Sequence, residues 1–422
     1  MGAGSTGQVM LDGESRWTIA GDAHVGDAGH GVLELTTSPG LGDPVVEVEG
    51  ALRIGVGGTG VGEVELFGAG SRVEATSFAV VGEGGEGHLT VGLADADTLL
   101  DASGQVACGS AGEGTVLVRD GAELRARKGA SPSGSAGIFG LNDGAVGSAL
   151  VQSEGHLNCV DGALVIGFRD GSSGALTVED GGLVTSVGGF VGREAGGAGT
   201  VVVTGVGSVW NSGGALEVGV EGSGTVEVTA GGRIEAGVVS VGPNGVLAGD
   251  GSIEGDLENA GVVAPGPVAA DATLGALMLE GGFSQSSTGR LVLEVGGTGP
   301  GQWDRLQGNF TGVFDLGGTL EIELFDGFVP AGGEVLIVLA GGFMANDFDS
   351  LVGPVPFTFA PGETVGIVTF CPPADLNCDG VVNGGDLGIQ LSQWGGPGTG
   401  DLNHDGVVNG ADVGLLLAAW SG

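Results

Sequence analysis

The sequence predicts a mainly β fold, a parallel β-helix, followed by a small helical segment at the C-terminus. Three observations lead to this prediction: a repeat marked by glycines, alternating apolar residues within each repeat, and two matching twelve-residue strings near the end of the chain. The repeat is an apolar residue followed by glycine, and it recurs about every 27 residues, which indicates a stacked repeat architecture. The marker glycines are Gly26, Gly55, Gly82, Gly109, Gly140, Gly167, Gly192, Gly219 and Gly242.

Within each repeat the residues alternate with a period of two. At Thr225, Val226, Glu227 and Val228 the valines are expected to face inward and the other two outward. Glycine pairs interrupt these runs, so each repeat holds roughly three short strands. Winding the chain into coils stacks each strand on its equivalent in the next repeat, and it covers edges that a flat sheet would expose. With strands about 4.8 Å apart, the coils would form a rod roughly 40 Å long.

The glycines are expected at the corners of the coils, where left-handed backbone angles favour this residue. Gly82, Gly84 and Gly87 also fit a glycine-rich dinucleotide-binding pattern. No helix is predicted after them, however, and the same strings recur along the chain. A structural role is therefore predicted for the glycines, in a β-helix that spans residues 1–264.

The character of the sequence changes near residue 265, because ten of the fourteen prolines lie at or after Pro265. Longer strands are predicted from Arg290 (RLVLEV), Thr319 (TLEIELF) and Glu334 (EVLIVLA), with long loops between them. These features favour an antiparallel β cap or a small β-sandwich over residues 265–360. A proline-bearing linker is expected at 361–373, before a final module at 374–422.

The chain is strongly acidic, with 52 acidic residues against 12 basic ones and a formal net charge of -40. Such a charge repels phosphate backbones and anionic lipids, so we expect no nucleic-acid partner and no membrane insertion. The opening MGAGSTGQVMLDG has neither the basic start nor the apolar stretch of a signal peptide. It is similar to the inside of a repeat, and we therefore expect that an export signal has been lost or the start miscalled.

The strongest chemical signal is the pair of strings DLNCDGVVNGGD (375–386, loop 1) and DLNHDGVVNGAD (401–412, loop 2). Calcium is held by six to eight oxygens, and a twelve-residue loop supplies them from positions 1, 3, 5, 7, 9 and 12, with glycine at position 6 for a sharp turn. Both strings meet this requirement, which predicts two calcium ions. The predicted ligands are Asp375, Asn377, Asp379, the Val381 carbonyl, Asn383 and Asp386 in loop 1, and Asp401, Asn403, Asp405, the Val407 carbonyl, Asn409 and Asp412 in loop 2.

A short amphipathic helix is predicted after each loop. Apolar residues recur there at i, i+4 and i+7, which predicts that they form the small core between the two halves. Prolines and glycines precede both loops, so no helix is expected on that side. The predicted core residues are Leu387, Leu391 and Trp394 in the first helix and Val413, Leu417 and Trp420 in the second.

These loop–helix repeats resemble the type I dockerin over residues 371–422. The resemblance implies two bound calcium ions, folding that depends on metal, and docking onto a cohesin-like protein. At loop positions 10 and 11, where many dockerins carry hydroxyl residues, this chain has Gly384-Gly385 and Gly410-Ala411, which weakens the docking inference more than the calcium inference. The docking positions that the resemblance implies are Ile389, Gln390, Gln393, Leu415, Leu416 and Ala419.

The segment from Gly26 to Phe370 resembles the β-helical passenger-like regions of bacterial surface and autotransporter-type proteins. The likeness depends on the G-x-G-x-[LV]-x-V unit and on the strings VTGVGSVWNSGGALEVG from Val203 and NAGVVAPG from Asn259. It implies a right-handed parallel β-helix and an extracellular or cell-surface location. A structural or adhesive scaffold is expected, with a cell-envelope component, reached through the C-terminal module, or a polysaccharide as further partners.

Parallel β-helices also include polysaccharide lyases and glycosidases, so an enzyme is the alternative. A lyase needs a base close to acidic groups, but the residue pattern predicts solvated charges, outward-facing glutamates on strands and four histidines on separate coils. We predict no catalytic residue and no organic cofactor. Trp303 is followed by Asp304 and Arg305, for which a structural ion pair is expected. The best candidate cluster combines Asp95, Asp97 and Asp101 with Arg125, Arg127 and Lys128.

The chain has four cysteines, and only Cys371 and Cys378 lie close together in the sequence. In an exported protein these two are candidates for a disulfide, and two free thiols are the alternative. Cys108 and Cys159 fall in strand-like segments, where they are expected to be small buried apolar residues.

Overall fold

A computed structural model describes residues 6–37, 42–92, 97–129, 134–266 and 274–422. The chain divides into two compact units, Met1–Gly261 and Val262–Gly422, which are described separately. Nearly all of the regular structure is β, and two short helices occur within the described residues. Neither helix is long and apolar enough to cross a membrane.

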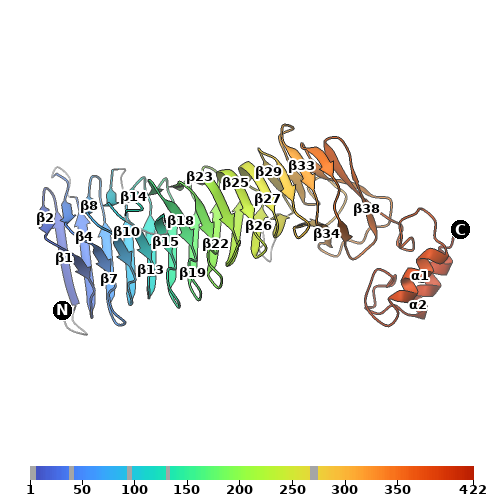
Figure 1. The fold of residues 1–422 in the computed structure, drawn as a ribbon, viewed down its shortest axis with the longest axis horizontal. Helices are drawn as coiled ribbons and strands as arrows, with labels where there is room; N and C mark the ends of the chain where they lie inside the picture. Colours follow the sequence, from blue (N-terminus) through green and yellow to red (C-terminus); the bar gives the residue numbers. More distant parts are fainter. Residues whose placement is uncertain (1–5, 38–41, 93–96, 130–133, 267–273) are drawn as a thin grey trace. The chain divides into compact units, whose positions relative to one another are not determined.

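The first unit is a parallel β-solenoid, as predicted. One strand from each coil enters the first sheet, where it pairs in parallel with the equivalent strand of the next coil (Figure 1). This sheet contains β1 (Thr6–Asp12), β4 (His30–Thr36), β7 (Val61–Leu66), β10 (Glu86–Val91), β13 (Glu113–Val118), β16 (Val146–Val151), β19 (Ser173–Val178), β22 (Ala198–Thr204), β24 (Ser223–Thr229) and β26 (Gly245–Gly249).

The remaining strands of the first unit also pair in parallel with their equivalents one coil away. Most coils have three short strands, as predicted, but the later coils merge two of them into one long strand. The short ones are β2 (Arg16–Ile19), β3 (Ala23–Val25), β5 (Val45–Val48), β6 (Leu52–Ile54), β8 (Arg72–Ala75), β9 (Ala79–Val81), β11 (Leu99–Ala102), β12 (Val106–Cys108), β14 (Glu123–Ala126), β15 (Ser135–Phe139), β17 (His156–Cys159), β18 (Ala163–Ile166), β20 (Leu183–Ser186) and β21 (Gly189–Val191). The long ones are β23 (Val209–Val218), β25 (Arg233–Val241) and β27 (Ser252–Asn259).

Alternation places one row of apolar side chains in the interior, each stacked on its equivalent in the next coil. Val64, Leu89 and Val116 occupy matching register positions and are almost fully buried. Stacking at about 4.8 Å keeps each side chain in contact with those above and below it, so burial is continuous along the coils. Cys108 and Cys159 are free thiols within this interior, as predicted, and burial raises the pKa of Cys159 to about 12.

The marker glycines lie at corners with left-handed backbone angles, with one exception. Gly140 has φ of 74°, and a Cβ there would lie 2.3 Å from the Ser173 carbonyl oxygen of the next coil. The other marker glycines from Gly26 to Gly219 also have φ between 63° and 74°. Gly242 is not among the left-handed glycines, but a Cβ there would lie 2.5 Å from Val220 Cα. Close approach of the next coil therefore excludes a side chain at these corners.

The second unit differs from the predicted antiparallel cap, because its strands continue to pair in parallel. β28, β31, β34 and β37 form one parallel series, β29 pairs with β32, and β30, β33 and β36 form another. These strands are β28 (Val262–Pro265), β29 (Ala276–Leu279), β30 (Phe283–Gln285), β31 (Arg290–Val295), β32 (Arg305–Gln307), β33 (Val313–Leu316), β34 (Thr319–Leu324), β35 (Val335–Ala340), β36 (Phe343–Asn346) and β37 (Ser350–Val352).

Among the described residues, antiparallel strand pairing occurs at the end of this region, apart from one isolated bridge between Val295 and Trp303. β39 (Val365–Phe370) pairs antiparallel with both β35 and β38 (Phe357–Pro361). The predicted linker at 361–373 therefore contains a paired strand. The prolines that suggested a change of fold lie mostly in loops and at strand ends, where they do not interrupt pairing.

The C-terminal segment holds two helices, α1 (Gly384–Ser392) and α2 (Gly410–Ala418), one after each predicted loop. Its core differs from the prediction: Leu391, Trp394, Leu417 and Trp420 are 41–55% exposed. Each helix instead buries the stripe that begins at its loop-closing aspartate, so the inward face is offset from the predicted one. The core consists of Ala374, Leu376, Val382 and Leu416, against which Leu387, Ile389 and Leu402 pack.

Candidate metal centres

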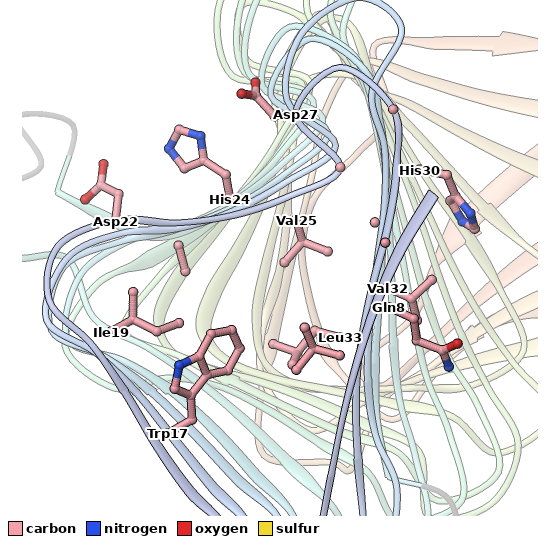
Figure 2. A pocket seen from close by; sticks show the side chains of 16 residues that line it. Gln8, Trp17, Ile19, Asp22, His24, Val25, Asp27, His30, Val32 and Leu33 are labelled. Atoms are coloured by element: carbon pink, nitrogen blue, oxygen red, sulfur yellow. The ribbon is translucent and has the colours of Figure 1, made fainter. Parts of the chain in front are cut away.

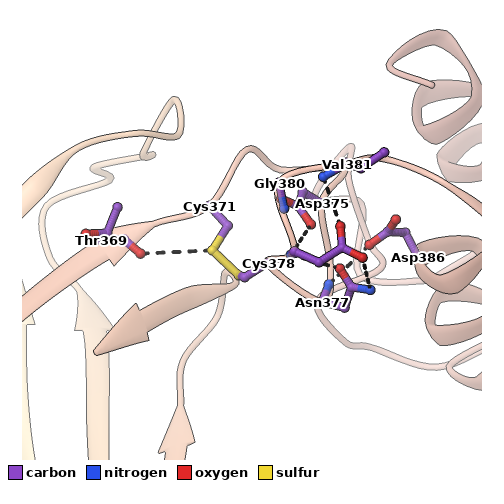
Figure 3. Close-up of a disulfide and its surroundings, with 9 residues drawn as sticks. Thr369, Cys371, Asp375, Asn377, Cys378, Gly380, Val381 and Asp386 are labelled. Atoms are coloured by element: carbon purple, nitrogen blue, oxygen red, sulfur yellow. Dashed lines mark hydrogen bonds between the residues drawn. A yellow bond between two sulfur atoms is a disulfide. The ribbon is translucent and has the colours of Figure 1, made fainter. Parts of the chain in front are cut away.

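Loop 1 folds around the carboxylate of Asp375, which is almost fully buried. Its Oδ1 accepts the backbone N–H of Asp379 at 3.1 Å, and its Oδ2 accepts that of Gly380 at 3.0 Å. The Asn377 side chain turns toward the same centre, where its Nδ2 donates to Asp379 Oδ2 at 3.0 Å (Figure 3). The side chains at loop positions 1, 3 and 5 are therefore gathered together.

The carboxylate of Asp386 closes loop 1 and starts helix α1. It accepts the backbone N–H groups of Asn377 at 3.1 Å and of Asn383 at 2.8 Å. Asn383 caps the helix, because its Oδ1 accepts the N–H of Gly385 at 2.7 Å. This reciprocal capping box stabilises the first turn, so loop closure and helix formation are linked.

Loop 2 repeats this hydrogen-bond pattern residue for residue. Two backbone N–H groups donate to its first aspartate, two more donate to its last one, and an asparagine caps the helix that follows. The equivalent contacts are Asp405 N–H to Asp401 Oδ1 (3.1 Å), Gly406 N–H to Asp401 Oδ2 (2.7 Å), Asn403 N–H to Asp412 Oδ1 (3.1 Å), Asn409 N–H to Asp412 Oδ2 (2.8 Å) and Ala411 N–H to Asn409 Oδ1 (2.8 Å).

The loop turns use left-handed backbone at positions 4 and 6. Gly380 has φ of 86° and Gly406 has φ of 92°. At position 4, Cys378 has φ of 56° and His404 has φ of 58°. The Cys378 sulfur is bonded to Cys371 (Figure 3). A sulfur held in a disulfide does not ligate a metal as a thiolate, which agrees with the expectation that position 4 is not a ligand.

The donors that the loops bring together are carboxylate, amide and carbonyl oxygens, the ligands that calcium prefers. All twelve predicted ligand residues belong to these two hydrogen-bond networks, because the carbonyls of Val381 and Val407 accept the Asn383 and Asn409 side-chain amides. Across the described ranges, no group of three or more His, Cys, Asp or Glu side chains is placed to hold a metal ion. The three aspartates of each loop are therefore not grouped around one point, although each loop combines them with asparagine and backbone oxygens.

Hydrogen bonding in loop 2 favours the ionised form of the Asp412 carboxyl. Burial opposes ionisation of Asp412, but the backbone N–H groups of Asn409 and Asn403 outweigh it and hold the pKa of this carboxyl below its usual value. A carboxylate that stays ionised without a salt-bridge partner is suited to a cation.

The best candidate for an enzyme site forms a ladder of ion pairs. Asp101 accepts from Arg127 and from Arg125 (3.4 Å), and Arg125 also donates to Glu123 (2.6 Å). Asp97 is exposed, and Asp95 lies outside the described residues. The arginines are thus paired with acids on the same and neighbouring coils, and the arrangement is that of a structural ladder.

Asp304 is not the ion pair predicted for it. Its carboxylate is buried, and it accepts the backbone N–H groups of Gly275 at 2.7 Å and of Glu294 at 2.9 Å. Burial raises its pKa to about 7. Arg305 points to an exposed position, while Trp303 donates from Nε1 to the Ile337 carbonyl at 2.9 Å. These contacts of Asp304 could not be predicted from the sequence, because its partners are backbone N–H groups, which every residue except proline carries.

A hollow of about 330 Å³ opens at the first coil. Trp17, Val25 and Leu33 point into it, whereas His24 and Asp27 point away from it (Figure 2). The hollow is therefore the apolar interior of that coil, and its polar side chains do not converge on a common point as a catalytic site requires.

The fold and the loops define a class: a parallel β-solenoid protein that carries two matching loop–helix motifs. No family model and no curated protein matches the chain. Among solved structures it is similar to the TibC-catalysed, hyperglycosylated TibA fragment, with 17% sequence identity and a TM-score of 0.37 over 79% of this chain and 97% of that one. A match at this level carries no conclusion about function, and the assignment of the solenoid depends on the strand pairing described above.

Proposed function

We propose that this chain is a secreted or cell-surface structural and adhesive scaffold whose segment 374–422 binds two calcium ions and docks onto another protein. The observation that supports it best is the repeated hydrogen-bond pattern of loops 1 and 2. Three acids crowded onto a short loop repel one another unless a cation compensates. Two loops that agree at ten of their twelve positions and share these contacts are therefore best explained by two cation sites.

Calcium in each loop would be held by the side chains at positions 1, 3, 5 and 12, by the position 7 carbonyl, and by Asn383 or Asn409 through water. The ion would neutralise the negative charge of the loop aspartates, which the chain's own residues there do not do. The protein's part is to orient the oxygens: Gly380 and Gly406 allow the sharp turn, and the backbone N–H groups fix the aspartates.

A non-catalytic role for the solenoid is supported by its outward-facing charges. The candidate base Arg125 and its neighbour Arg127 are engaged by carboxylates. His156 is half-buried, and burial lowers its pKa. Its Nε2 lies 2.8 Å from the Thr185 hydroxyl on the next coil. These contacts stabilise the stacking of coils, which is the role that a scaffold requires of them.

Some of the predicted docking positions are accessible and others are not, and the docking surface that we propose includes exposed residues next to them. Gln390 and Leu416 are fully buried, so they are not accessible to a partner. Leu391, Trp394 and Leu417 are each at least half exposed, and they offer an apolar surface at the end of the helices. A partner with a complementary apolar patch, such as a cohesin-like protein, fits this surface.

Calorimetric titration of calcium into the metal-stripped full chain tests the proposal. We expect two ions per chain and a gain of helical circular dichroism, because each ion would stabilise the capped first turn of a helix. Asp375→Ala and Asp401→Ala should each remove one ion. Glu221→Ala, an exposed acid on the solenoid, should leave both. Absence of binding at millimolar calcium would refute the calcium proposal and leave the scaffold without a docking module.

A further inference from the structure

Helix α1 holds the chain just before loop 2. Gln390 Nε2 donates to the Gly400 carbonyl at 2.9 Å, and Gln393 Oε1 accepts the Gly400 N–H at 2.7 Å. Gln393 Nε2 also donates to the Thr399 hydroxyl at 3.1 Å. Both backbone groups of Gly400 are therefore fixed by side chains of α1 and of its C-cap residue Gln393, one residue before Asp401, the first predicted ligand of loop 2.

A second contact links the end of α1 to the middle of loop 2. Val408, at position 8 of the loop, accepts the Gly395 N–H at 2.9 Å, and its own N–H donates to the Gly396 carbonyl at 2.9 Å. The chain that follows α1 is therefore tied to loop 2 by two backbone hydrogen bonds. Together with the glutamines, it holds loop 2 at two separate points.

The glutamine contacts have no counterpart before loop 1. The second contact does have one, because Val382, at position 8 of loop 1, accepts the Ser421 N–H at 3.0 Å and donates its own N–H to Ser421 Oγ at 3.0 Å. The residues of α2 that match Gln390 and Gln393 are Leu416 and Ala419, whose side chains have no hydrogen-bonding group. Loop 1 has in addition the disulfide between Cys371, which follows β39, and its own position 4. The two loops thus have matching ligands but different supports.

Gln390 is itself unusual for a core position. It is fully buried, and its Oε1 is one of two buried side-chain atoms within the described residues that have no hydrogen-bond partner. Leaving a buried acceptor unsatisfied costs stability, so an apolar residue would be favoured there by folding alone. Leucine does occupy the matching position in α2. The glutamine therefore indicates a role other than core packing.

We propose that Gln390 and Gln393 are positioning residues that make the calcium affinity of loop 2 depend on helix α1, and through it on loop 1. This inference rests on the proposed function. Asp386 is both the last ligand of loop 1 and a member of the capping box of α1, so an ion in loop 1 stabilises α1. An ordered α1 presents both amides to Gly400, which fixes the start of loop 2. The two sites are then coupled, and the coupling acts in both directions.

Calcium titration of the full chain carrying Gln390→Leu and Gln393→Ala tests the coupling, since these are the residues that α2 already uses. We expect the second ion, which is the one in loop 2, to bind about tenfold more weakly, because each lost hydrogen bond to the backbone changes an equilibrium several-fold. In the Asp401→Ala background, which isolates loop 1, the same pair of substitutions should leave the affinity unchanged. Gln393→Ala alone should weaken the second ion by several-fold.

Ser392→Ala is the matched control on the same helix, because its hydroxyl donates only within α1, to the Ile389 carbonyl at 2.6 Å. It should leave both affinities as in the wild type. Unchanged affinity of the second ion in the double variant, or equal weakening of both loops, would overturn the inference. A wild-type chain that binds no calcium would refute the proposed function instead, so the two failures are distinguishable.

Discussion

Outside the loops, Asp304 is a buried carboxyl whose pKa lies far above its ordinary value. Its carboxylate lies inside the second unit, where it joins the backbone at Gly275 and Glu294. Burial disfavours the ionised form, and the nearby Glu294 carboxylate adds to this effect, whereas the two N–H donors favour ionisation. Burial prevails, and the pKa rises to about 7. Asp304 therefore changes its charge in a range where exposed aspartates stay ionised.

The sign of the pH effect follows from this shift. Between about pH 4 and 7 the folded chain keeps a proton on Asp304 that the unfolded chain has released, so this group's contribution to stability is full below pH 4 and is lost as the pH rises through about 7. We expect the free energy of unfolding to fall less steeply with pH in Asp304→Asn than in the wild type. Urea unfolding at pH 4.5 and 7.5 measures both slopes, with Glu280→Gln as an exposed control. Equal slopes in all three proteins would contradict the assignment.

At the scale of elements, the corner glycines separate two physical effects that one substitution usually mixes. Gly140 and Gly144 both have left-handed angles, with φ of 74° and 72°. A Cβ at Gly140 would lie 2.3 Å from the Ser173 carbonyl oxygen, whereas nothing lies within 4 Å of one at Gly144. Gly144 therefore tests backbone strain alone, and Gly140 tests strain together with the close approach of the next coil.

We expect Gly144→Ala to reduce the free energy of unfolding by about 1 kcal/mol, the cost of left-handed backbone in a residue with a Cβ. Gly140→Ala should cost roughly 1–3 kcal/mol more, because the added methyl group forces two coils apart. Urea unfolding of both variants measures the difference. Equal losses would show that the coils relax around the methyl group and that close approach is not what selects glycine.

The solenoid could be predicted from the sequence because a period of two and a glycine spacing of about 27 residues are set by local geometry that every coil repeats. The same reasoning failed from residue 265 on. Longer strands and prolines suggested antiparallel pairing, but pairing direction depends on which strands meet in space, and parallel partners about 30 residues apart leave the same alternation.

The sequence located the two loops and the helices that follow them, because each predicted ligand residue is fixed by its position in a short string; that these residues bind calcium stays a prediction. The buried faces of the helices were not predicted correctly. A stripe at i, i+4 and i+7 from Leu387 competes with one from Asp386 through Gln390, and hydropathy favours the first. The structure buries the stripe from Asp386 through Gln390. Asp386 must turn inward to close its loop, so the side of the helix that contains Asp386 also faces inward.

At the scale of the whole molecule, the outward face of the first unit orders its charges along the coils. One file of side chains occupies a single register position, and its acids are interrupted by amides, hydroxyls and one arginine, which reduces repulsion between neighbouring coils. Among its ion pairs is the one between Asp101 and Arg125. The file consists of Thr18, Glu47, Glu74, Asp101, Arg125, Asn158, Thr185, Asn211, Glu235 and Glu254.

Two opposite salt effects follow from this distribution, and their sizes decide the outcome. Salt weakens ion pairs such as Asp101–Arg125, but exposed pairs contribute only about 0–1 kcal/mol each. Salt also screens the repulsion within a chain of net charge -40, a larger effect because all the excess acids take part. The screening length falls from about 30 Å at 0.01 M to about 10 Å at 0.1 M, so the repulsion is relieved over this range.

We therefore expect the melting temperature of the metal-stripped chain to rise when sodium chloride is raised from about 10 to about 150 mM, as followed by circular dichroism with a chelator present. Calcium chloride at matched ionic strength, without chelator, should raise it further in the wild type. In a chain carrying both Asp375→Ala and Asp401→Ala, the two salts should raise the melting temperature by more similar amounts. Both salts screen charge, whereas only calcium would bind to the intact loops. A melting temperature that falls with sodium chloride would mean that the ion pairs stabilise the chain more than the repulsion from its net charge destabilises it.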